Sequence, residues 1–386
     1  MVFIKKEEII LKITKLELFT VKPRWLFLKM STDEGISGWG EPVVEGRAST
    51  TKQCVEELGY YLIGKDPRNI EDNFQVLYRG GFYRGGPVLS SAISGLEQAM
   101  WDIKGKFYNA PVYELLGGKV RDKVQMYCQA GSVEDVLDKK AAGYRAFKLG
   151  SLGATGYVDT YRKIDEKLKA IAAIRDAVGY EVDLAIDFHG EVHRPMAKVL
   201  AKELEQFKMM FIEEPVLCDN MEAFAEIARH TCIPIATGER MYTRWDYKRL
   251  FDQKAVDIVQ PDLSHAGGIW ECRKIAAMAE AYDMAVAPHC PLGPISLASC
   301  LQLDVCTPNA FIQEQALNIH YTEGAEFLTY LRNPEVLKLK DGFVDAPVLP
   351  GLGLDVNEEA VRAADATGHD WKNPILRLED GSFAEW

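Results

Sequence analysis

The sequence of 386 residues predicts an α/β protein, in which a (β/α) TIM-type barrel carries an N-terminal α+β capping domain completed by the C-terminal tail. From residue 125 onward, eight short apolar runs alternate with helix-length segments, which is the pattern of parallel βαβ units. The residues before 125 lack this alternation, and a chain of this length favours more than one domain. We therefore expect domains at 1–124, 125–340 and 341–386.

The first unit begins with strands. The segments LKITKLELF and WLFLKM are typical of strands, TDEG of a hairpin turn, and ISGWGEP of a returning strand. A glycine-rich loop at 80–87 then precedes apolar residues that recur at helical spacing from Ala92 to Phe107. The sequence therefore predicts a long helix there, with Ser90 or Ser91 as its N-terminal cap.

The eight expected barrel strands are short and apolar, as buried parallel strands are. In chain order they are QMYCQ, RAFKLG, DLAIDF, MMFIEE, IPIAT, VDIVQ, MAVAP and AFIQE. The tail from about residue 341 contains Gly and Pro turns and no further strand–helix unit. We expect this tail to return and cover the N-terminal domain.

The composition excludes several classes of partner. A net charge of −12 without a basic run argues against nucleic acid and anionic membranes. The eight cysteines show no C-x-x-C spacing, which predicts reduced thiols in a cytosolic protein. No apolar run approaches the ~20 residues that span a bilayer, and the start MVFIKKEEIILKITK lacks the apolar core of a signal peptide. We expect a cytoplasmic location.

Ionisable residues follow six consecutive strands of the predicted barrel at intervals of 23 to 27 residues. They are Asp187 with His189, Glu213, Glu239, Asp262, His289 and Glu314. A single Asp at a strand end is often a cap for the next turn. Six such groups in succession differ, because strand ends meet at the rim where barrel active sites lie, and converging charges destabilise the fold unless they share a partner. We interpret the set as one functional site.

Three of these groups are carboxylates on adjacent strands: Asp187, Glu213 and Glu239. All-oxygen ligation without Cys or His favours a hard cation, and Mg²⁺ suits a site that also admits water and substrate oxygens. The sequence therefore predicts a magnesium site formed by these three residues.

The remaining groups are suited to moving protons. His189 and His289 lie on strands across the pocket, and Asp262 is placed to hold the His289 ring and raise its basicity. Residues i and i+2 of a strand share a face, so His189 is expected beside Asp187. Glu314, if protonated, can stabilise a developing oxyanion.

These residues resemble the enolase superfamily, in its mandelate-racemase branch. The resemblance covers nearly the whole chain and rests on GWGEP, GFYRGGP, IDFHG, FIEEPV, GERM, QPDLSHAGG and APHCPLGP. It implies removal of the proton beside a sugar-acid carboxylate, followed by loss of the neighbouring hydroxyl, with a His base and magnesium as is general for this superfamily. The roles it implies are metal binding by Asp187, Glu213 and Glu239, base His289 with Asp262, acid His189 and oxyanion stabiliser Glu314.

The resemblance makes D-galactonate the first expected substrate, with gluconate, arabinonate or an aldarate as alternatives. A racemase is less favoured, because the second strand ends Lys148-Leu149-Gly150 and offers no second base at the third position. A non-catalytic sugar-acid-binding protein is argued against by the intact set of ligands and histidines. The expected partners are the small sugar acid and, from the resemblance, further copies of the chain in an even-numbered homo-oligomer.

Other polar and aromatic residues receive secondary roles. Glu214 is expected to orient its neighbours, and Arg240 to pair with either the carboxylates or the substrate. Trp25 and Tyr83 are expected in first-domain loops that close over the pocket. The remaining histidines are interpreted as ordinary, with His265 the least certain: His193, His230, His265, His320 and His369.

Overall fold

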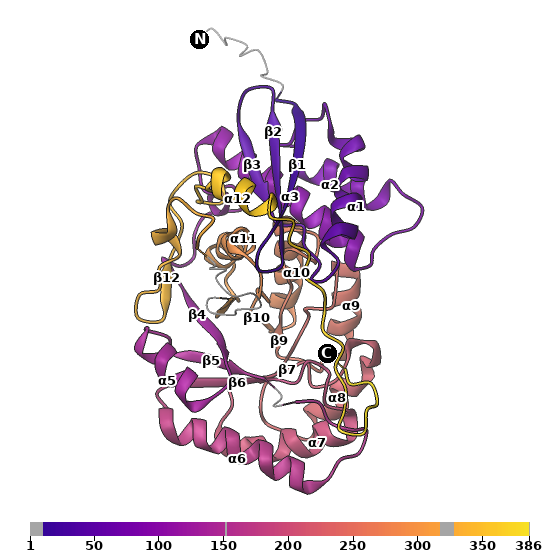
Figure 1. The fold of residues 1–386 in the computed structure, drawn as a ribbon, viewed down its shortest axis with the longest axis vertical. Coiled ribbons are helices and arrows are strands. Elements are labelled where there is room, and N and C mark those ends of the chain that lie inside the picture. The colour runs from indigo at the N-terminus through magenta and orange to yellow at the C-terminus, as the bar shows by residue number, and fades with distance from the viewer. Residues whose placement is uncertain (1–10, 151–152, 317–327, 386) are drawn as a thin grey trace.

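The computed structural model describes residues 11–150, 153–316 and 328–385, and Figure 1 shows a smaller domain seated on a barrel. The smaller domain contains an antiparallel sheet in the order β1-β2-β3, and helices pack against it. The bounds are β1 Ile13–Val21, β2 Trp25–Thr32, β3 Ser37–Gly40, α1 Ala48–Leu62, α2 Ile70–Arg79, α3 Pro87–Tyr108 and α4 Val112–Leu115.

Helix α3 packs tightly against β3 through two glycines. A Cβ atom on Gly40 would lie 1.9 Å from the carbonyl oxygen of Gly95, so neither backbone could keep its position with a larger residue there. The helix begins at Pro87, with Gly86 as its N-cap at φ 82°, and not at the serines that we expected. Proline suits the first helical position because its φ is already helical and its missing N–H needs no partner.

The larger domain is a parallel barrel, which confirms the predicted fold class. Consecutive strands pair from β4 to β10, and β11 pairs with β4. A bridge from Val286 to Ala310 joins β10 to the segment that enters β11. The strands are β4 Lys123–Ala130, β5 Ala146–Leu149, β6 Asp183–Asp187, β7 Ile212–Glu213, β8 Ile235–Thr237, β9 Ile258–Val259, β10 Ala285–Val286 and β11 Gln313–Gln315.

A helix follows each strand from β4 to β10. These helices are α5 Val133–Ala141, α6 Tyr161–Val178, α7 Arg194–Glu203, α8 Glu222–Ala228, α9 Arg244–Gln253, α10 Ile269–Ala281 and α11 Pro294–Val305. Short 3₁₀ turns lie at Leu204–Phe207, Cys218–Asn220 and Pro334–Leu337. Because each helix returns the chain to the start of the next strand, every strand ends at the same rim.

The barrel interior below this rim is filled by side chains. Large and small residues alternate around it, and the rings of Tyr127 and Phe211 meet edge to face with centroids 6.0 Å apart. The buried set is Tyr127, Ala146, Ala185, Phe211, Ala236, Ile258, Ala287 and Ile312. The barrel is therefore a packed core, and any ligand must bind above this layer.

The tail pairs with the barrel before it reaches the smaller domain, a contact that the sequence did not predict. Strand β12, Phe343–Asp345, pairs antiparallel with β4. Helix α12, Glu358–Asp365, packs on β1, where Asp365 accepts a 2.7 Å hydrogen bond from the Thr20 amide. The yellow segment of Figure 1 then descends along the barrel and ends beside it.

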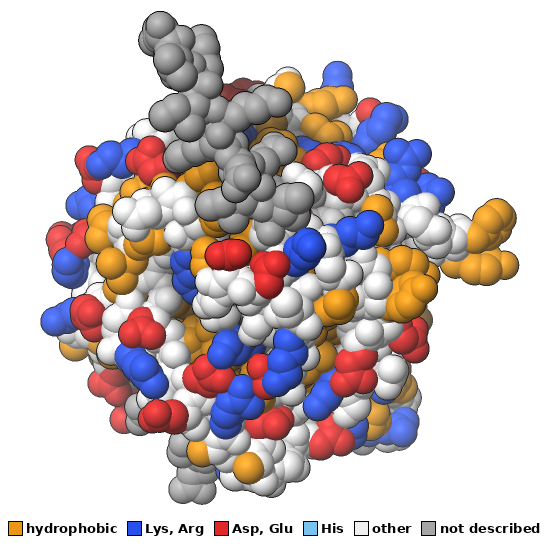
Figure 2. Space-filling view, turned by 90° about the horizontal axis from the view of Figure 1, so that it is seen from above, with side chains coloured by type: hydrophobic (Ala, Val, Ile, Leu, Met, Phe, Trp, Pro, Cys, Tyr) orange, Lys and Arg blue, Asp and Glu red, His pale blue; other side chains and the backbone are white. Residues whose placement is uncertain are grey.

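The distribution of charge on the surface and the apolarity of the helices can be compared with what the composition predicts. Figure 2 shows Lys and Arg interspersed with Asp and Glu over the upper face, so no basic patch gathers there. Within residues 11–150, 153–316 and 328–385, no helix combines the length and apolarity needed to cross a bilayer. The eight cysteines are free thiols, and Cys232 is exposed.

Candidate active site

Three carboxylates converge where β6, β7 and β8 end. Asp187 and Glu213 are paired neighbours in the sheet, and Glu239 follows β8 by two residues. One oxygen from each lies within 4.8 Å of the others. Asp187 and Glu213 are buried, so water does not screen the repulsion between their charges. The structure thus brings the predicted metal ligands together.

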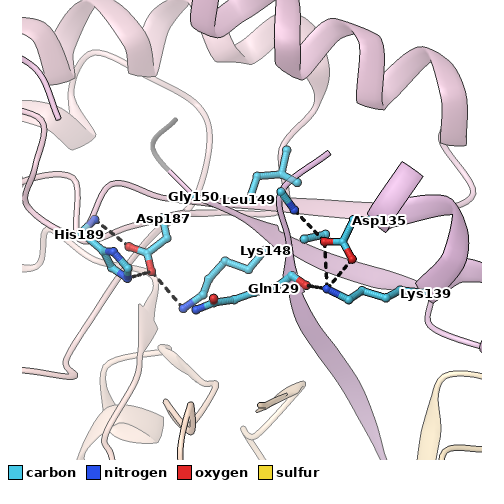
Figure 3. A pocket seen from close by; sticks show the side chains of 10 residues that line it. Gln129, Asp135, Lys139, Lys148, Leu149, Gly150, Asp187 and His189 are labelled. Carbon is cyan, nitrogen blue, oxygen red and sulfur yellow. Dashed lines mark hydrogen bonds and ion pairs between the residues drawn. The ribbon is translucent and has the colours of Figure 1, made fainter. Parts of the chain in front are cut away.

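Lys148 lies among these carboxylates and was given no role by the sequence analysis. Its Nζ atom is 2.7 Å from Glu213 Oε1, 3.1 Å from Asp187 Oδ2 and 2.9 Å from Glu314 Oε1. Burial of Lys148 opposes its charge, but the three carboxylates outweigh burial and raise its pKa well above the ordinary value. Figure 3 shows Asp187 between His189 and Lys148. The signal available in the sequence was its place near the end of the second barrel strand.

The donor set fits a hard divalent cation. Burial and the neighbouring Asp187 raise the pKa of Glu213 well above its usual range, which reports negative charges crowded together. Gln260 donates a 2.7 Å hydrogen bond to Glu213 Oε2 and so orients that carboxylate. Oxygen ligands from three carboxylates at this spacing are the kind that Mg²⁺ binds.

His189 lies just beyond β6 in a left-handed backbone conformation, with φ 50°. Its position beside Asp187 therefore does not come from strand alternation, as we expected, but from a turn. The turn is held by the His189 amide, which donates to Asp187 Oδ1 at 2.8 Å, while Nε2 lies 2.9 Å from Asp187 Oδ2. Asp187 outweighs burial and raises the pKa of His189 to about 9, so this ring holds a proton at neutral pH.

His289 lies across the pocket and is held by Asp262. Its Nδ1 atom is 2.8 Å from Asp262 Oδ2, and its Nε2 atom is 3.3 Å from Glu239 Oε2. The Ser264 amide donates to the other oxygen of Asp262 at 2.7 Å, which fixes that carboxylate. Burial lowers the pKa of His289, but Glu239 and Asp262 outweigh burial and raise it well above the usual value.

The oxyanion role predicted for Glu314 has the condition that its carboxyl group is protonated. The Cys290 amide donates to Glu314 Oε2 at 2.9 Å, and Lys148 lies against Oε1. Burial favours the neutral form, yet Lys148 and His289 outweigh it and lower the pKa of Glu314. In this arrangement Glu314 is an acceptor of hydrogen bonds, because both of its partners are donors.

Glu214 and Arg240 support the site from outside the triad. Thr237 Oγ1 donates to Glu214 Oε1, which ties the end of β7 to β8. Burial and the nearby Glu239 raise the pKa of Glu214 to about 7. Arg240 donates to the His189 carbonyl oxygen at 2.7 Å and lies 3.3 Å from Glu239 Oε1. Of the two expected partners of Arg240, the carboxylates and the substrate, the structure shows a contact with a carboxylate.

Two cavities open at this rim and share Gln129 and His189. One, of about 360 Å³, reaches Lys148, Gly150 and Asp187; the other, of about 400 Å³, reaches Glu239 and His289. Both volumes are within the range of small-molecule sites, about 300–1,000 Å³. Because the second cavity also touches Arg24 and Glu45, it lies between the barrel and the smaller domain.

The loop position expected for Trp25 is wrong, whereas Tyr83 lies in the loop between α2 and α3. Trp25 is the first residue of β2, is 3% exposed and stacks on Phe27, so it is a core residue and not a loop residue. Tyr83 is 88% exposed, contacts Phe82, and lines neither cavity at the rim. Trp25 begins the apolar run WLFL, whose four residues are all buried, and the sequence did contain that signal.

The other histidines separate into one at the site and others away from it. His265 lines the larger cavity, and its Nδ1 atom is 2.8 Å from Ser91 Oγ. His320 is outside the described residues. The remaining three have structural contacts: His193 stacks on Tyr157, His230 bonds the Glu226 carbonyl, and His369 bonds the Pro23 carbonyl.

Comparison with known proteins places the chain in a family. Residues 3–117 match the mandelate racemase/muconate lactonizing enzyme N-terminal domain, and residues 132–360 match the enolase C-terminal domain-like family. The chain is 53% identical to a D-galactonate dehydratase of Ralstonia pickettii (strain 12J) and 51% identical to one of Cronobacter sakazakii (strain ATCC BAA-894). Each match covers 97% of this chain and 100% of the relative.

Solved structures show the same architecture. A mandelate racemase/muconate lactonizing enzyme from Sulfitobacter sp. superimposes with a TM-score of 0.87 at 32% identity, covering 95% of this chain and 99% of the other. A member of the enolase superfamily from Salmonella Typhimurium gives 0.82 at 31% identity, covering 91% and 98%. The chain therefore belongs to the mandelate racemase/muconate lactonizing branch of the enolase superfamily, and it is a hydro-lyase of the dehydratase kind.

Proposed function

We propose that the protein converts D-galactonate to 2-dehydro-3-deoxy-D-galactonate in the presence of Mg²⁺. The observation that carries this proposal is the placement of two histidines beside one carboxylate triad: His189 contacts Asp187 and His289 contacts Glu239. The chain is also 53% identical to a D-galactonate dehydratase. Such a pair can remove one proton and supply another, which is what loss of water requires.

His289 is proposed as the base. Asp262 accepts from its Nδ1 at 2.8 Å, which leaves Nε2 as the atom that can take the proton beside the substrate carboxylate. His189 is proposed as the acid, since its raised pKa keeps a proton on the ring that can pass to the departing hydroxyl. The two roles require opposite starting protonation states, so His289 must be neutral at the outset. Glu239, which raises the pKa of His289 in this structure, is one of the carboxylates that the bound ion would engage.

Asp187, Glu213 and Glu239 are proposed to hold the Mg²⁺ ion. When bound, the ion would supply positive charge that spreads the negative charge developing on the substrate carboxylate. Lys148 adds a fixed positive charge at the same place, and Glu314 orients Lys148 and the Cys290 amide. We propose that Glu314 contributes to oxyanion stabilisation indirectly, by orienting the Lys148 ammonium group and the Cys290 amide.

One alternative activity, racemisation, is argued against by the residue at the end of the second barrel strand. Gly150 offers no base there, so a two-base racemase lacks its second partner. Gluconate, arabinonate and an aldarate remain the competing substrates. We also propose a cytoplasmic location and an even-numbered homo-oligomer, for which the family resemblance is the support.

A substrate panel tests the proposal. The purified protein is incubated with MgCl₂ and each sugar acid, and 2-keto acid is measured with semicarbazide. We expect D-galactonate to give the highest kcat/KM. Another acid turned over at least tenfold more efficiently would replace galactonate, and no keto acid from any of them would refute the dehydratase proposal.

A further inference from the structure

The segment after α12 ends in a hairpin beside the larger cavity. The Ala384 amide donates to the Leu376 carbonyl at 3.1 Å, and the Leu378 amide donates to the Ser382 carbonyl at 2.9 Å. Ala384 is buried, which fixes the end of the hairpin. The next residue, Glu385, lines the cavity that also contains His189 and His289. A residue nearly 200 positions from the first of these histidines thus forms part of the same pocket.

The basic side chains of this cavity each have a carboxylate partner: His189 contacts Asp187, His265 contacts Glu45 and His289 contacts Asp262. Arg24 lies 3.6 Å from Glu45 and donates to the Pro291 carbonyl at 3.3 Å. Arg240 lies 3.3 Å from Glu239. Among the residues that the structure describes, the Glu385 carboxylate has no hydrogen bond or ion pair. Both arginines of the cavity are therefore engaged, and Glu385 contributes a negative charge with no described partner to the lining of the cavity.

We propose that Glu385 determines specificity at the end of the substrate remote from the reacting carboxylate. It accepts hydrogen bonds from the terminal hydroxyl of an aldonic acid and repels the second carboxylate of an aldaric acid. This inference rests on the proposed function, because the carboxylate triad and Lys148 must hold the reacting end of the acid. The other end of the sugar acid then extends toward the cavity residues that come from outside the barrel, which are Arg24, Glu45 and Glu385.

The physical reason is a difference in charge at one position. A carboxylate is purely an acceptor, so it pairs well with a hydroxyl donor and leaves no unpaired group. Two carboxylates brought together in a pocket repel, and both arginines of the cavity are already engaged by a carboxylate. Specificity built on repulsion discriminates against one ligand without adding affinity for the other.

Galactonate and galactarate isolate this position, because they share the configuration of all four secondary alcohols and differ only in the terminal group. We expect the wild-type enzyme to prefer galactonate. Glu385→Gln should raise the ratio of galactarate to galactonate kcat/KM at least tenfold, mainly through KM for galactarate. Glu385→Asp keeps the charge and should keep the preference. Glu379→Gln makes the same change on the exposed part of the hairpin and should leave kcat/KM unchanged for both substrates.

The outcomes separate the inference from the function on which it rests. A ratio that stays within twofold in Glu385→Gln, or a wild type that prefers galactarate, overturns the inference alone if dehydration is observed. If another aldonic acid proves to be the substrate, the same comparison is made with its aldaric counterpart. If the wild type dehydrates no sugar acid, the proposed function fails and the inference fails with it.

Discussion

The two histidines should be separable by isotope exchange. His289→Asn removes the proposed base and should stop both keto acid formation and exchange of the proton beside the carboxylate. His189→Asn removes only the proposed acid, so the proton should still be removed and returned from solvent while little product forms. General acid catalysis contributes about 10²–10⁴-fold, so we expect turnover to fall by that factor in His189→Asn. At about 1.4 kcal/mol per tenfold, the barrier rises by about 3–5 kcal/mol.

The contacts of each ring justify the asymmetry. Asp262 occupies His289 Nδ1 at 2.8 Å, so Nε2, which lies 3.3 Å from Glu239 Oε2, is the atom left to exchange a proton with the substrate. His189 holds its proton through the 2.9 Å contact with Asp187. The assay is ¹H NMR in heavy water, in which loss of the C2 signal of galactonate is compared with formation of the keto acid.

One control is essential for this assay, because His189 touches a proposed metal ligand. Mg²⁺ affinity should be measured for both variants by calorimetry, and only variants that bind the ion normally are compared. Exchange kept by His289→Asn and lost by His189→Asn, with metal binding intact, would mean that the two roles are reversed.

The remaining predictions concern the support of the base, the protonation of the acid and the docking of α3. Asp262→Asn removes the charged partner of the 2.8 Å contact with His289. Because a hydrogen bond to a charged group is worth about 1.5–3 kcal/mol, kcat/KM should fall about 10–150-fold. A loss below threefold would exclude the supporting role of Asp262. Activity should decline as pH rises through about 9, because His189 must be protonated to act as the acid and loses its proton there; a pH profile of kcat/KM that stays flat to pH 10 would contradict this. Gly40→Ala places a Cβ 1.9 Å from a backbone oxygen and should lower the free energy of unfolding by about 3 kcal/mol or more in urea denaturation, whereas Gly81→Ala, in an open loop, should change it by less than about 0.5 kcal/mol; equal effects of both would refute the close-packing argument.

Much of the site could be predicted because strand ends in a barrel share one rim. The regular intervals between Asp187, Glu213 and Glu239 place the three carboxylates near one another without any knowledge of side-chain conformation. The same reasoning located His289 and Asp262. Topology therefore carried the prediction, since neighbouring parallel strands bring equivalent positions together.

The parts that were missed depend on contacts that local pattern does not encode. Lys148 lies within an apolar run, and only the fold reveals that its ammonium group meets three carboxylates. The oxyanion role of Glu314 depended on its protonation, which sequence spacing could not decide because Lys148 is its partner in the fold. Glu385 reaches the cavity through a hairpin whose position is set by packing against distant elements. Such contacts require tertiary structure, because sequence spacing says nothing about them.

The most direct test of the central claim is the metal dependence of galactonate dehydration. The protein is treated with EDTA, dialysed and assayed for keto acid from D-galactonate before and after addition of MgCl₂, with Glu213→Gln assayed in parallel. We predict that chelation abolishes activity, that Mg²⁺ restores it in the wild type, and that Glu213→Gln stays inactive at all Mg²⁺ concentrations tested. Undiminished keto acid formation after chelation, or full activity of Glu213→Gln, would contradict the account.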